Sequence, residues 1–328
     1  MPKAKITAVG CYAPPGLLTN ADLEKLVDTN HEWIMERTGI AQRHIAAPEQ
    51  ATSDMAVQAG RLALERRGMD ANELEAIIVG TVTPDMLFPS TACLVQDRLG
   101  IEHAWGFDLF AGCCGYLYSL SVGAQLVMAG THKKVMVIGA DTMSRIIDYQ
   151  DRGTCVLFGD AAGAVIIEPA EEGEGMLDLV HRVDGAGGKY LMMPAGGSRL
   201  PASEETVRDR LHYAKQDGPQ VYKFAVRNMH DVCAEVLRRN GFTADDVDIF
   251  IPHQANLRII TAAAERLGVP LDRVMINIER YGNTTGGTIP LATEEAIATG
   301  RLKKGDLVLF AAVGAGYTVG ASLWRWAY

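Results

Sequence analysis

The sequence has no long hydrophobic run, and no apolar stretch approaches the roughly 18 residues that a membrane-spanning helix needs. The N-terminus also has no basic region followed by a hydrophobic signal core. We therefore expect a cytoplasmic protein with no membrane partner. With 328 residues, of which 48% are hydrophobic, the chain can bury a large core.

Cysteines are few, and they show no pattern typical of metal sites or disulfide frameworks. No C-x-x-C pair and no Cys/His metal spacing occurs. The net charge of −9 argues against general nucleic-acid binding, because phosphate contacts need a strongly basic face. We expect no metal, no structural disulfide and no nucleic-acid partner. The six cysteines are Cys11, Cys93, Cys113, Cys114, Cys155 and Cys233.

We infer the domain organisation from an internal duplication rather than from a linker. The segment 68–79 aligns without gaps with 241–252, and each reads as a helix end, a polar turn and an apolar strand. Cys113 stands 17 residues before Gly130, just as Asn283 stands 17 residues before Gly300, which predicts equivalent positions in two similar βα units. A repeat this long indicates two related halves rather than a solenoid. We place them at 1–172 and 173–328, with the boundary in the acidic run 171–175.

Several short segments are continuously apolar, as strands covered on both faces should be. They alternate with helical patterns, which predicts an α/β fold with mostly parallel or mixed sheets between helical layers. The clearest of these strands are 76–79, 135–138 and 307–310.

Cys113 follows a strand-like run and precedes a helix of small and apolar residues. The positive end of a helix dipole favours thiolate over thiol, so we expect a lowered pKa and a nucleophilic cysteine. The alternative is that Cys113 and Cys114 are small hydrophobic residues packed in a buried junction.

Two further polar residues stand at the ends of predicted elements. His253 follows a short apolar strand at the start of an amphipathic helix, and Asn283 lies in a Gly/Thr-rich turn before another helix. Each alone is compatible with an ordinary cap, core or turn residue. Together with Cys113 they form a Cys, His and Asn set.

These segments resemble the thiolase superfamily and, most closely, the β-ketoacyl-[acyl-carrier-protein] synthase III family. The resemblance runs nearly end to end and is carried by 19–25, 33–40, 151–154, 158–163, 252–258 and 282–284. It implies a thiolase-like αβαβα layered sandwich of two pseudo-symmetric halves, assembled as a homodimer. It also implies the initiating condensation of type II fatty acid synthesis, in which an acyl-CoA primer and malonyl-acyl carrier protein give 3-oxoacyl-acyl carrier protein, CoA and CO2. The resemblance implies no cofactor, since the coenzyme A thioester is a substrate.

The resemblance assigns the catalytic roles. Cys113 would carry the acyl group, while His253 and Asn283 would donate hydrogen bonds to the enolate oxygen formed on decarboxylation. The backbone N–H groups of Cys113 and Ala315 would hold the acyl carbonyl oxygen. Two positions depart from the family pattern. The family usually has a small residue such as alanine or serine where this chain has Cys114, and a glycine where it has Ala315.

The resemblance also assigns binding surfaces. The adenine and pantetheine of CoA would meet Trp33, Arg37, Arg152 and Asn256. Acyl carrier protein, which is acidic in the family, would meet Lys223, Arg258 and Arg266. Phe88 would reach into the acyl pocket of the partner subunit.

Three alternatives remain open from the sequence. One is a related condensing enzyme of secondary metabolism with a different primer or a CoA-bound acceptor, although the length near 330 residues favours the initiating type. A hydrolase that pairs the thiol with a general base is the second. The third is a non-catalytic acyl-binding protein on the same fold.

Overall fold

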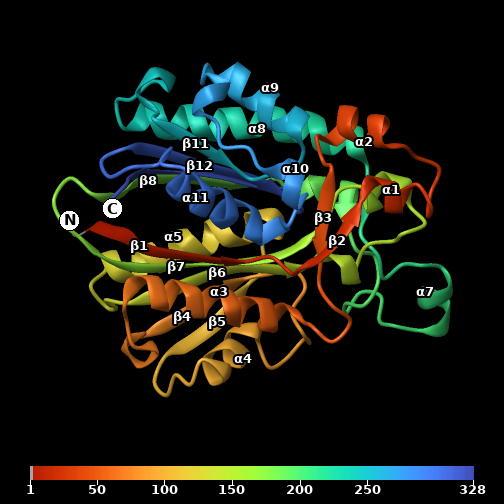
Figure 1. The fold of residues 1–328 in the computed structure, drawn as a ribbon, viewed down its shortest axis with the longest axis horizontal. Coiled ribbons are helices and arrows are strands. Elements are labelled where there is room, and N and C mark those ends of the chain that lie inside the picture. The colour runs from red at the N-terminus through yellow and green to blue at the C-terminus, as the bar shows by residue number, and fades with distance from the viewer. Residues whose placement is uncertain (1–2) are drawn as a thin grey trace.

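Two β-sheets form the centre of the molecule (Figure 1). The computed structural model describes residues 3–328. The first sheet has the order β1 (Lys3–Tyr12), β7 (Asp160–Ala170), β6 (Val135–Thr142), β4 (Ala76–Gly80), β5 (Trp105–Leu109). The second has the order β11 (Ile249–Pro252), β12 (Leu307–Gly314), β13 (Thr318–Arg325), β8 (Gly175–Val183).

The two sheets share one pairing pattern. β4 pairs with β6 in parallel, as β11 does with β12, and the next two pairings across each sheet are antiparallel. β5 extends the first sheet as a parallel edge strand, and its counterpart in the second half is reduced to an isolated bridge between Phe250 and Val274. The predicted mixed sheets are confirmed, and the shared topology agrees with the duplication in the sequence.

Helices cover both sheets and fill the space between them (Figure 1). α3 (Thr52–Arg67) and α4 (Thr91–Arg98) pack on the outer face of the first sheet. α5 (Gly115–Met128) and α11 (Thr288–Ala298) lie between the sheets, and each contacts strands of both. α8 (Gly218–Arg239) and α9 (Leu257–Leu267) cover the outer face of the second sheet. The predicted αβαβα order is confirmed.

Short elements surround this framework. The small strands and helices are β2 (Gly16–Thr19), β3 (Gln42–Ile45), β9 (Leu191–Met192), β10 (Lys215–Gln216), α1 (Asn20–Leu23), α2 (His31–Thr38), α6 (Arg152–Cys155), α7 (Glu204–Arg208) and α10 (Ile278–Tyr281). The 3-10 turns are η1 (Ala71–Glu73), η2 (Gly112–Cys114), η3 (Met143–Arg145), η4 (Gly185–Tyr190), η5 (Ala244–Asp246), η6 (Leu271–Arg273) and η7 (Thr285–Gly287).

Hydrophobic patterning explains where each element lies. β4, β6 and β12 are buried along their whole length, as their continuous apolar sequences require. α8 buries one face through Ala225, Met229, Val232 and Val236, at the three- and four-residue spacing of a helix. Within residues 3–328, no helix combines the length and apolar character needed to cross a bilayer.

The chain passes from the first sheet to the second in the acidic turn between β7 and β8. Glu174 in this turn pairs with Lys5 at 3.1 Å and with Lys304 at 2.8 Å, one lysine from each predicted half. The core between the sheets also draws on both sides, with Val137 and Phe310 in one cluster. These contacts join the two predicted halves into one packed unit. The boundary at residue 172 stays a prediction.

Candidate active site

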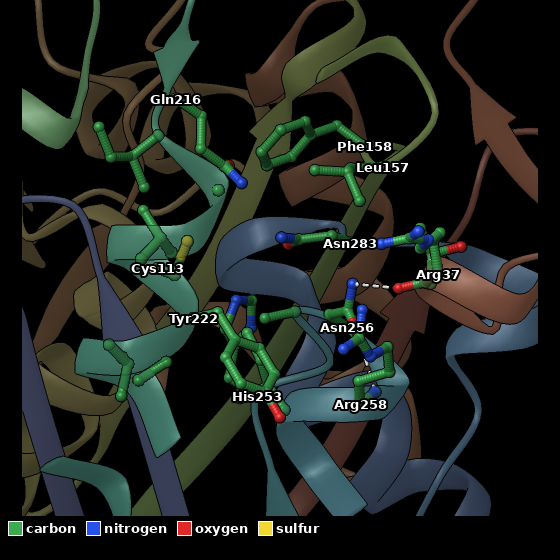
Figure 2. A pocket seen from close by; sticks show the side chains of 18 of the residues that line it. Arg37, Cys113, Leu157, Phe158, Gln216, Tyr222, His253, Asn256, Arg258 and Asn283 are labelled. Atoms are coloured by element: carbon green, nitrogen blue, oxygen red, sulfur yellow. Dashed lines mark hydrogen bonds between the residues drawn. The ribbon is translucent and has the colours of Figure 1, made fainter. Parts of the chain in front are cut away.

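A cavity of about 440 Å³ lies where the two halves meet, and side chains from both line it. Figure 2 shows Cys113, His253 and Asn283 pointing toward a common space from different elements. The predicted site residues that line the cavity are Cys113, His253, Asn283, Trp33, Arg37, Asn256 and Arg258. Among residues 3–328, no group of three or more His, Cys, Asp or Glu side chains is arranged to hold a metal ion.

Adjacent cysteines have different environments. Cys113 lies in η2, between β5 and α5, and is partly exposed to the cavity, whereas Cys114 is fully buried in the core between the sheets. Two glycines allow the backbone to pack closely here. A Cβ on Gly112, whose φ is +56°, would lie 2.7 Å from the Ala315 nitrogen, and one on Gly314 would lie 2.5 Å from the Cys113 nitrogen.

The protonation state of Cys113 differs from the sequence prediction. Burial raises the pKa of the thiol to about 12, and the nearby carboxylate of Asp141 adds to this increase. The backbone N–H groups of Cys113 and Ala315 and the hydroxyl of Thr285 favour the thiolate and oppose the shift. The prediction of a lowered pKa was wrong, because desolvation of the sulfur outweighs the helix start.

The same contacts bear on the predicted oxyanion pair. The N–H groups of Cys113 and Ala315 both favour the thiolate of Cys113, so both are close to its sulfur, and their role toward an acyl oxygen stays a prediction. Ala315 does not adopt a positive φ, whereas Gly316 does, with φ +142°. Alanine in place of the family's glycine therefore keeps the N–H group without backbone strain.

His253 follows β11 and is completely buried. Its backbone N–H donates to the Ala311 carbonyl at 2.7 Å, which ties the loop to β12. Its Nδ1 lies 2.6 Å from the hydroxyl oxygen of Thr288, and its Nε2 has no hydrogen-bond partner among residues 3–328. Burial lowers the pKa of the imidazole to about 3, so the ring is neutral at physiological pH.

Asn283 is fixed through both its backbone and its side chain. Its N–H donates to the Leu157 carbonyl at 2.9 Å, and its carbonyl accepts from Gly159 N–H at 3.1 Å. Its side-chain oxygen accepts from Thr285 N–H at 3.0 Å. Because the amide oxygen is occupied, the NH2 group is the part of the side chain left to donate into the cavity.

A buried carboxylate supports the Asn283 turn from behind. Asp141 accepts from Gly286 N–H at 2.9 Å and from Val82 N–H at 2.7 Å, and it also accepts from the hydroxyls of Thr81 and Thr83. Burial raises its pKa to about 6, although these donors act in the opposite direction. Asp141 thus joins β6 of the first sheet to the turn that carries Asn283.

Three of the four predicted CoA-binding residues, Trp33, Arg37 and Asn256, line the cavity. The Arg152 guanidinium lies 4.9 Å from the centre of the Trp33 ring, in a cation–π contact. Asn256 caps α9 by accepting from Arg258 N–H, and its amide donates to the Arg37 carbonyl at 2.9 Å (Figure 2). Arg152 itself does not line the cavity, although its neighbour Gly153 does.

The predicted carrier-protein residues lie outside or at the edge of the cavity. Arg258 lines it and stacks over Tyr222 at 5.4 Å, whereas Lys223 and Arg266 are exposed on α8 and α9 and do not line it. None of the three forms an ion pair within residues 3–328.

Phe88 does not line the cavity of its own chain. It is 84% exposed, and the adjacent Leu87 is 85% exposed, at the tip of the loop between β4 and α4. Ala315 does not line the cavity either, although Gly314 and Tyr317 do.

Sequence reasoning missed several residues of the site. The apolar walls of the cavity include Leu157, Phe158, Met229, Val313 and Tyr317. Of these, only Phe158 belongs to a segment that carries the family resemblance. Thr285 and Thr288 follow Asn283 in the same Gly/Thr-rich turn, which was the one available signal for them. Asp141 had no signal, because its partners come from distant parts of the chain.

Comparisons with known proteins agree with this geometry. Two family models match: 3-oxoacyl-[acyl-carrier-protein (ACP)] synthase III over residues 107–185, and the C-terminal model of the same family over residues 237–326. The chain is 68% identical to the β-ketoacyl-[acyl-carrier-protein] synthase III of Solibacter usitatus, across all of both chains.

Solved structures give the same result. The 3-oxoacyl-[acyl-carrier-protein] synthase III of Aquifex aeolicus is 43% identical, with a TM-score of 0.92 over 98% of this chain and 100% of that one. A priming β-ketosynthase from a polyketide biosynthetic pathway is 33% identical, with a TM-score of 0.92 over 99% of this chain and 96% of that one. The extent and level of identity show that the chain belongs to the β-ketoacyl-[acyl-carrier-protein] synthase III family.

Proposed function

We propose that this protein initiates fatty acid synthesis by condensing an acyl-CoA primer with malonyl-acyl carrier protein. The observation that carries the proposal is the convergence of Cys113, His253 and Asn283 on one cavity at the junction of the two halves. A thiol, a neutral imidazole and an amide are the groups that acyl transfer followed by enolate formation requires. Family membership points to the same reaction.

The first half-reaction is self-acylation. The sulfur of Cys113 attacks the thioester carbonyl of acyl-CoA, an S–C bond forms, and the C–S bond to CoA breaks. The thiol proton leaves with CoA as its free thiol. During attack, the N–H groups of Cys113 and Ala315 stabilise the developing oxyanion.

The second half-reaction is decarboxylative condensation. The malonyl C–C bond to its carboxylate breaks, CO2 leaves, and the electron pair forms an enolate whose oxygen accepts hydrogen bonds from His253 and Asn283. The enolate carbon then attacks the acyl carbonyl on Cys113, and the C–S bond breaks. The resulting thiolate takes one proton, so each cycle releases 3-oxoacyl-acyl carrier protein, CoA and CO2. This chemistry calls for no cofactor beyond the CoA thioester substrate.

The entrance suits a CoA molecule. Trp33 and Arg152 offer an aromatic face and a guanidinium plane for stacking on adenine, with Arg37 beside them. Asn256 also lines the cavity, beside Arg37, and would contact the pantetheine arm.

An acidic carrier protein would meet the basic side chains of α8 and α9. Lys223, Arg258 and Arg266 lie on these helices on an otherwise acidic protein, and they are free of ion pairs within the described residues. Charge reversal of Arg258 or Lys223 should raise the KM for malonyl-acyl carrier protein about two- to fivefold, and added salt should reduce the effect. The matched control is Arg61→Glu, an exposed arginine on α3 on the opposite side of the molecule. Equal damage to self-acylation would contradict a carrier-protein role.

A homodimer would cover the exposed apolar loop. Leu87 and Phe88 present large hydrophobic surfaces to water in the single chain, and the edge strand β5 lies in the same half with Phe110, 76% exposed, just after it. We expect a dimer in which Phe88 contributes to the partner's acyl pocket. Native mass spectrometry tests the assembly, and a monomer at micromolar concentration would overturn it.

The decisive experiment separates the two half-reactions. Intact-mass spectrometry after incubation with a panel of acyl-CoAs should show one acyl group per chain, and subsequent malonyl-acyl carrier protein should remove it as product. We expect the reaction to take place in the cytoplasm, where both substrates would be present.

The polyketide priming relative supports one alternative. A CoA-bound acceptor or a different primer would serve secondary metabolism with the same three residues. Faster turnover with malonyl-CoA than with malonyl-acyl carrier protein would favour that alternative.

A further inference from the structure

Among residues 3–328 the ring of His253 makes one side-chain hydrogen bond, and that bond decides where its proton lies. The hydroxyl oxygen of Thr288, the first residue of α11, is 2.6 Å from Nδ1, and both side chains are buried. Because burial keeps the imidazole neutral, one ring nitrogen carries a hydrogen and the other has a lone pair. The direction of the Thr288 contact therefore fixes the tautomer.

The length of the contact favours the hydroxyl as donor. Hydrogen bonds donated by N–H are usually about 2.9–3.0 Å long, whereas those donated by O–H are usually about 2.7–2.8 Å and extend down to about 2.5 Å. A separation of 2.6 Å fits a hydroxyl donating to Nδ1 and is short for a ring N–H donating to the hydroxyl.

The competing acceptor for the Thr288 hydroxyl already has a partner. The Thr285 carbonyl lies 3.1 Å from the same hydroxyl oxygen, which is longer than the contact to Nδ1. That carbonyl also accepts the backbone N–H of Thr288 at the end of η7. The hydroxyl has one proton to donate, and the shorter contact, to Nδ1, has the better geometry for it.

We infer that Thr288 is a positioning residue that donates its hydroxyl to Nδ1 of His253 and so places the ring proton on Nε2. Nε2 is buried without a partner among residues 3–328, and His253 lines the cavity. An Nε2–H group there is a donor ready for the enolate oxygen, a role that rests on the proposed function. The same tautomer has no ring lone pair facing the cavity, so His253 cannot take the proton of Cys113.

A measurement on the unmodified protein tests the tautomer directly. In protein labelled with ¹⁵N-histidine, long-range ¹H–¹⁵N correlation spectra distinguish protonated from unprotonated ring nitrogens. The His253 signals are those that disappear in His253→Asn. We expect a protonated Nε2 and an unprotonated Nδ1, and the reverse pattern would overturn the inference.

A pair of variants tests the consequence for catalysis. Thr288→Val keeps the shape and removes the hydroxyl, and it should lower malonyl decarboxylation about 10- to 100-fold, somewhat less than the loss of a whole oxyanion donor. Self-acylation should stay within about twofold, because it needs no donor from His253. Thr288→Ser keeps the hydroxyl and should restore both decarboxylation and the Nε2–H signature.

The possible failures are distinguishable. Wild-type decarboxylation in Thr288→Val, or an equal loss in the valine and serine variants, would contradict the role of the Thr288 hydroxyl. Unchanged decarboxylation in His253→Ala would instead contradict the proposed function of His253, while the spectrum would still decide the tautomer.

Discussion

The two halves of the molecule contribute to the cavity through similar elements, but the functional residue occupies a different position relative to those elements in each half. In each half a 3-10 turn leads into an α-helix, η2 into α5 and η7 into α11, and a glycine with positive φ follows the helix. Cys113 lies inside its turn, whereas Asn283 lies two residues before its turn begins. The predicted equivalence of the two positions was therefore inexact, because α5 has 14 residues and α11 has 11.

This difference separates the chemistry. The first half brings a sulfur to the start of a helix, and the second brings two neutral donors, His253 and Asn283, in front of another. The nucleophile and the donors thus come from different copies of one unit. Loss of either donor should therefore stop the second half-reaction and spare self-acylation, whereas loss of Cys113 removes the acyl group that condensation also needs.

The largest effect should come from the nucleophile. Cys113→Ser should abolish acyl transfer, because an alkoxide is far harder to form than a thiolate. Cys114→Ala should keep most of the activity and cost about 1 kcal/mol of stability through a small void in the core. Peptide mapping after acyl-CoA labelling checks the assignment, and label on Cys114 would reverse it.

Removing either donor should give the next largest effect. His253→Ala and Asn283→Ala should each lower malonyl decarboxylation about 10²- to 10³-fold, the usual loss for one oxyanion donor. Self-acylation followed by intact-mass spectrometry should be largely unchanged. Loss of acylation with decarboxylation preserved would break the division between the halves.

The neutral state of His253 predicts a particular pH dependence. Because its pKa falls from the ordinary 6.5 to about 3 on folding, protonation of His253 should add no acidic limb near pH 6.5 to decarboxylation. The unfolded chain binds this proton more readily than the folded one. The contribution of the neutral His253 ring to the free energy of unfolding is therefore fully present above pH 6.5 and is lost as the pH falls toward 3. In urea unfolding, any stability advantage of wild type over His253→Ala should therefore shrink as the pH falls, and a constant difference would contradict a buried neutral ring.

The smallest effect should come from the positive-φ residue that begins each turn. It is Gly112 in the first half, at +56°, and Thr285 in the second, at +51°. Thr285→Gly should relieve about 1 kcal/mol of backbone strain yet slow self-acylation severalfold, because the lost hydroxyl favours the Cys113 thiolate. Thr285→Ser is the control that retains the hydroxyl, and equal acylation rates in the two variants would show that the hydroxyl is dispensable.

Local patterns were sufficient to predict the framework. The apolar runs 76–79, 135–138 and 307–310 all lie within observed strands, because continuous burial leaves a direct mark on composition. Cys113, His253 and Asn283 were found because each stands at the end of a recognisable element. The layer order came from the family resemblance and is confirmed by the packing of α5 and α11 between the sheets.

What escaped prediction depends on contacts between distant segments. The pKa of Cys113 is set by desolvation and by Asp141, neither of which can be read from the residues around the cysteine. Thr288 reaches His253 across 35 positions of sequence, and Asp141 reaches Gly286 across 145. Such pairings appear only once the chain has folded, and the second of them also needs the two halves to be packed together.

The close backbone packing beside Cys113 has a consequence for protein engineering. A side chain at residue 314 would begin 2.5 Å from the Cys113 nitrogen, and one at residue 112 would begin 2.7 Å from the Ala315 nitrogen, so neither glycine has room to vary. The apolar wall is more permissive, since Leu157, Met229 and Val313 line the cavity and already carry side chains. A library aimed at new primer specificity should therefore randomise the wall and hold both glycines constant.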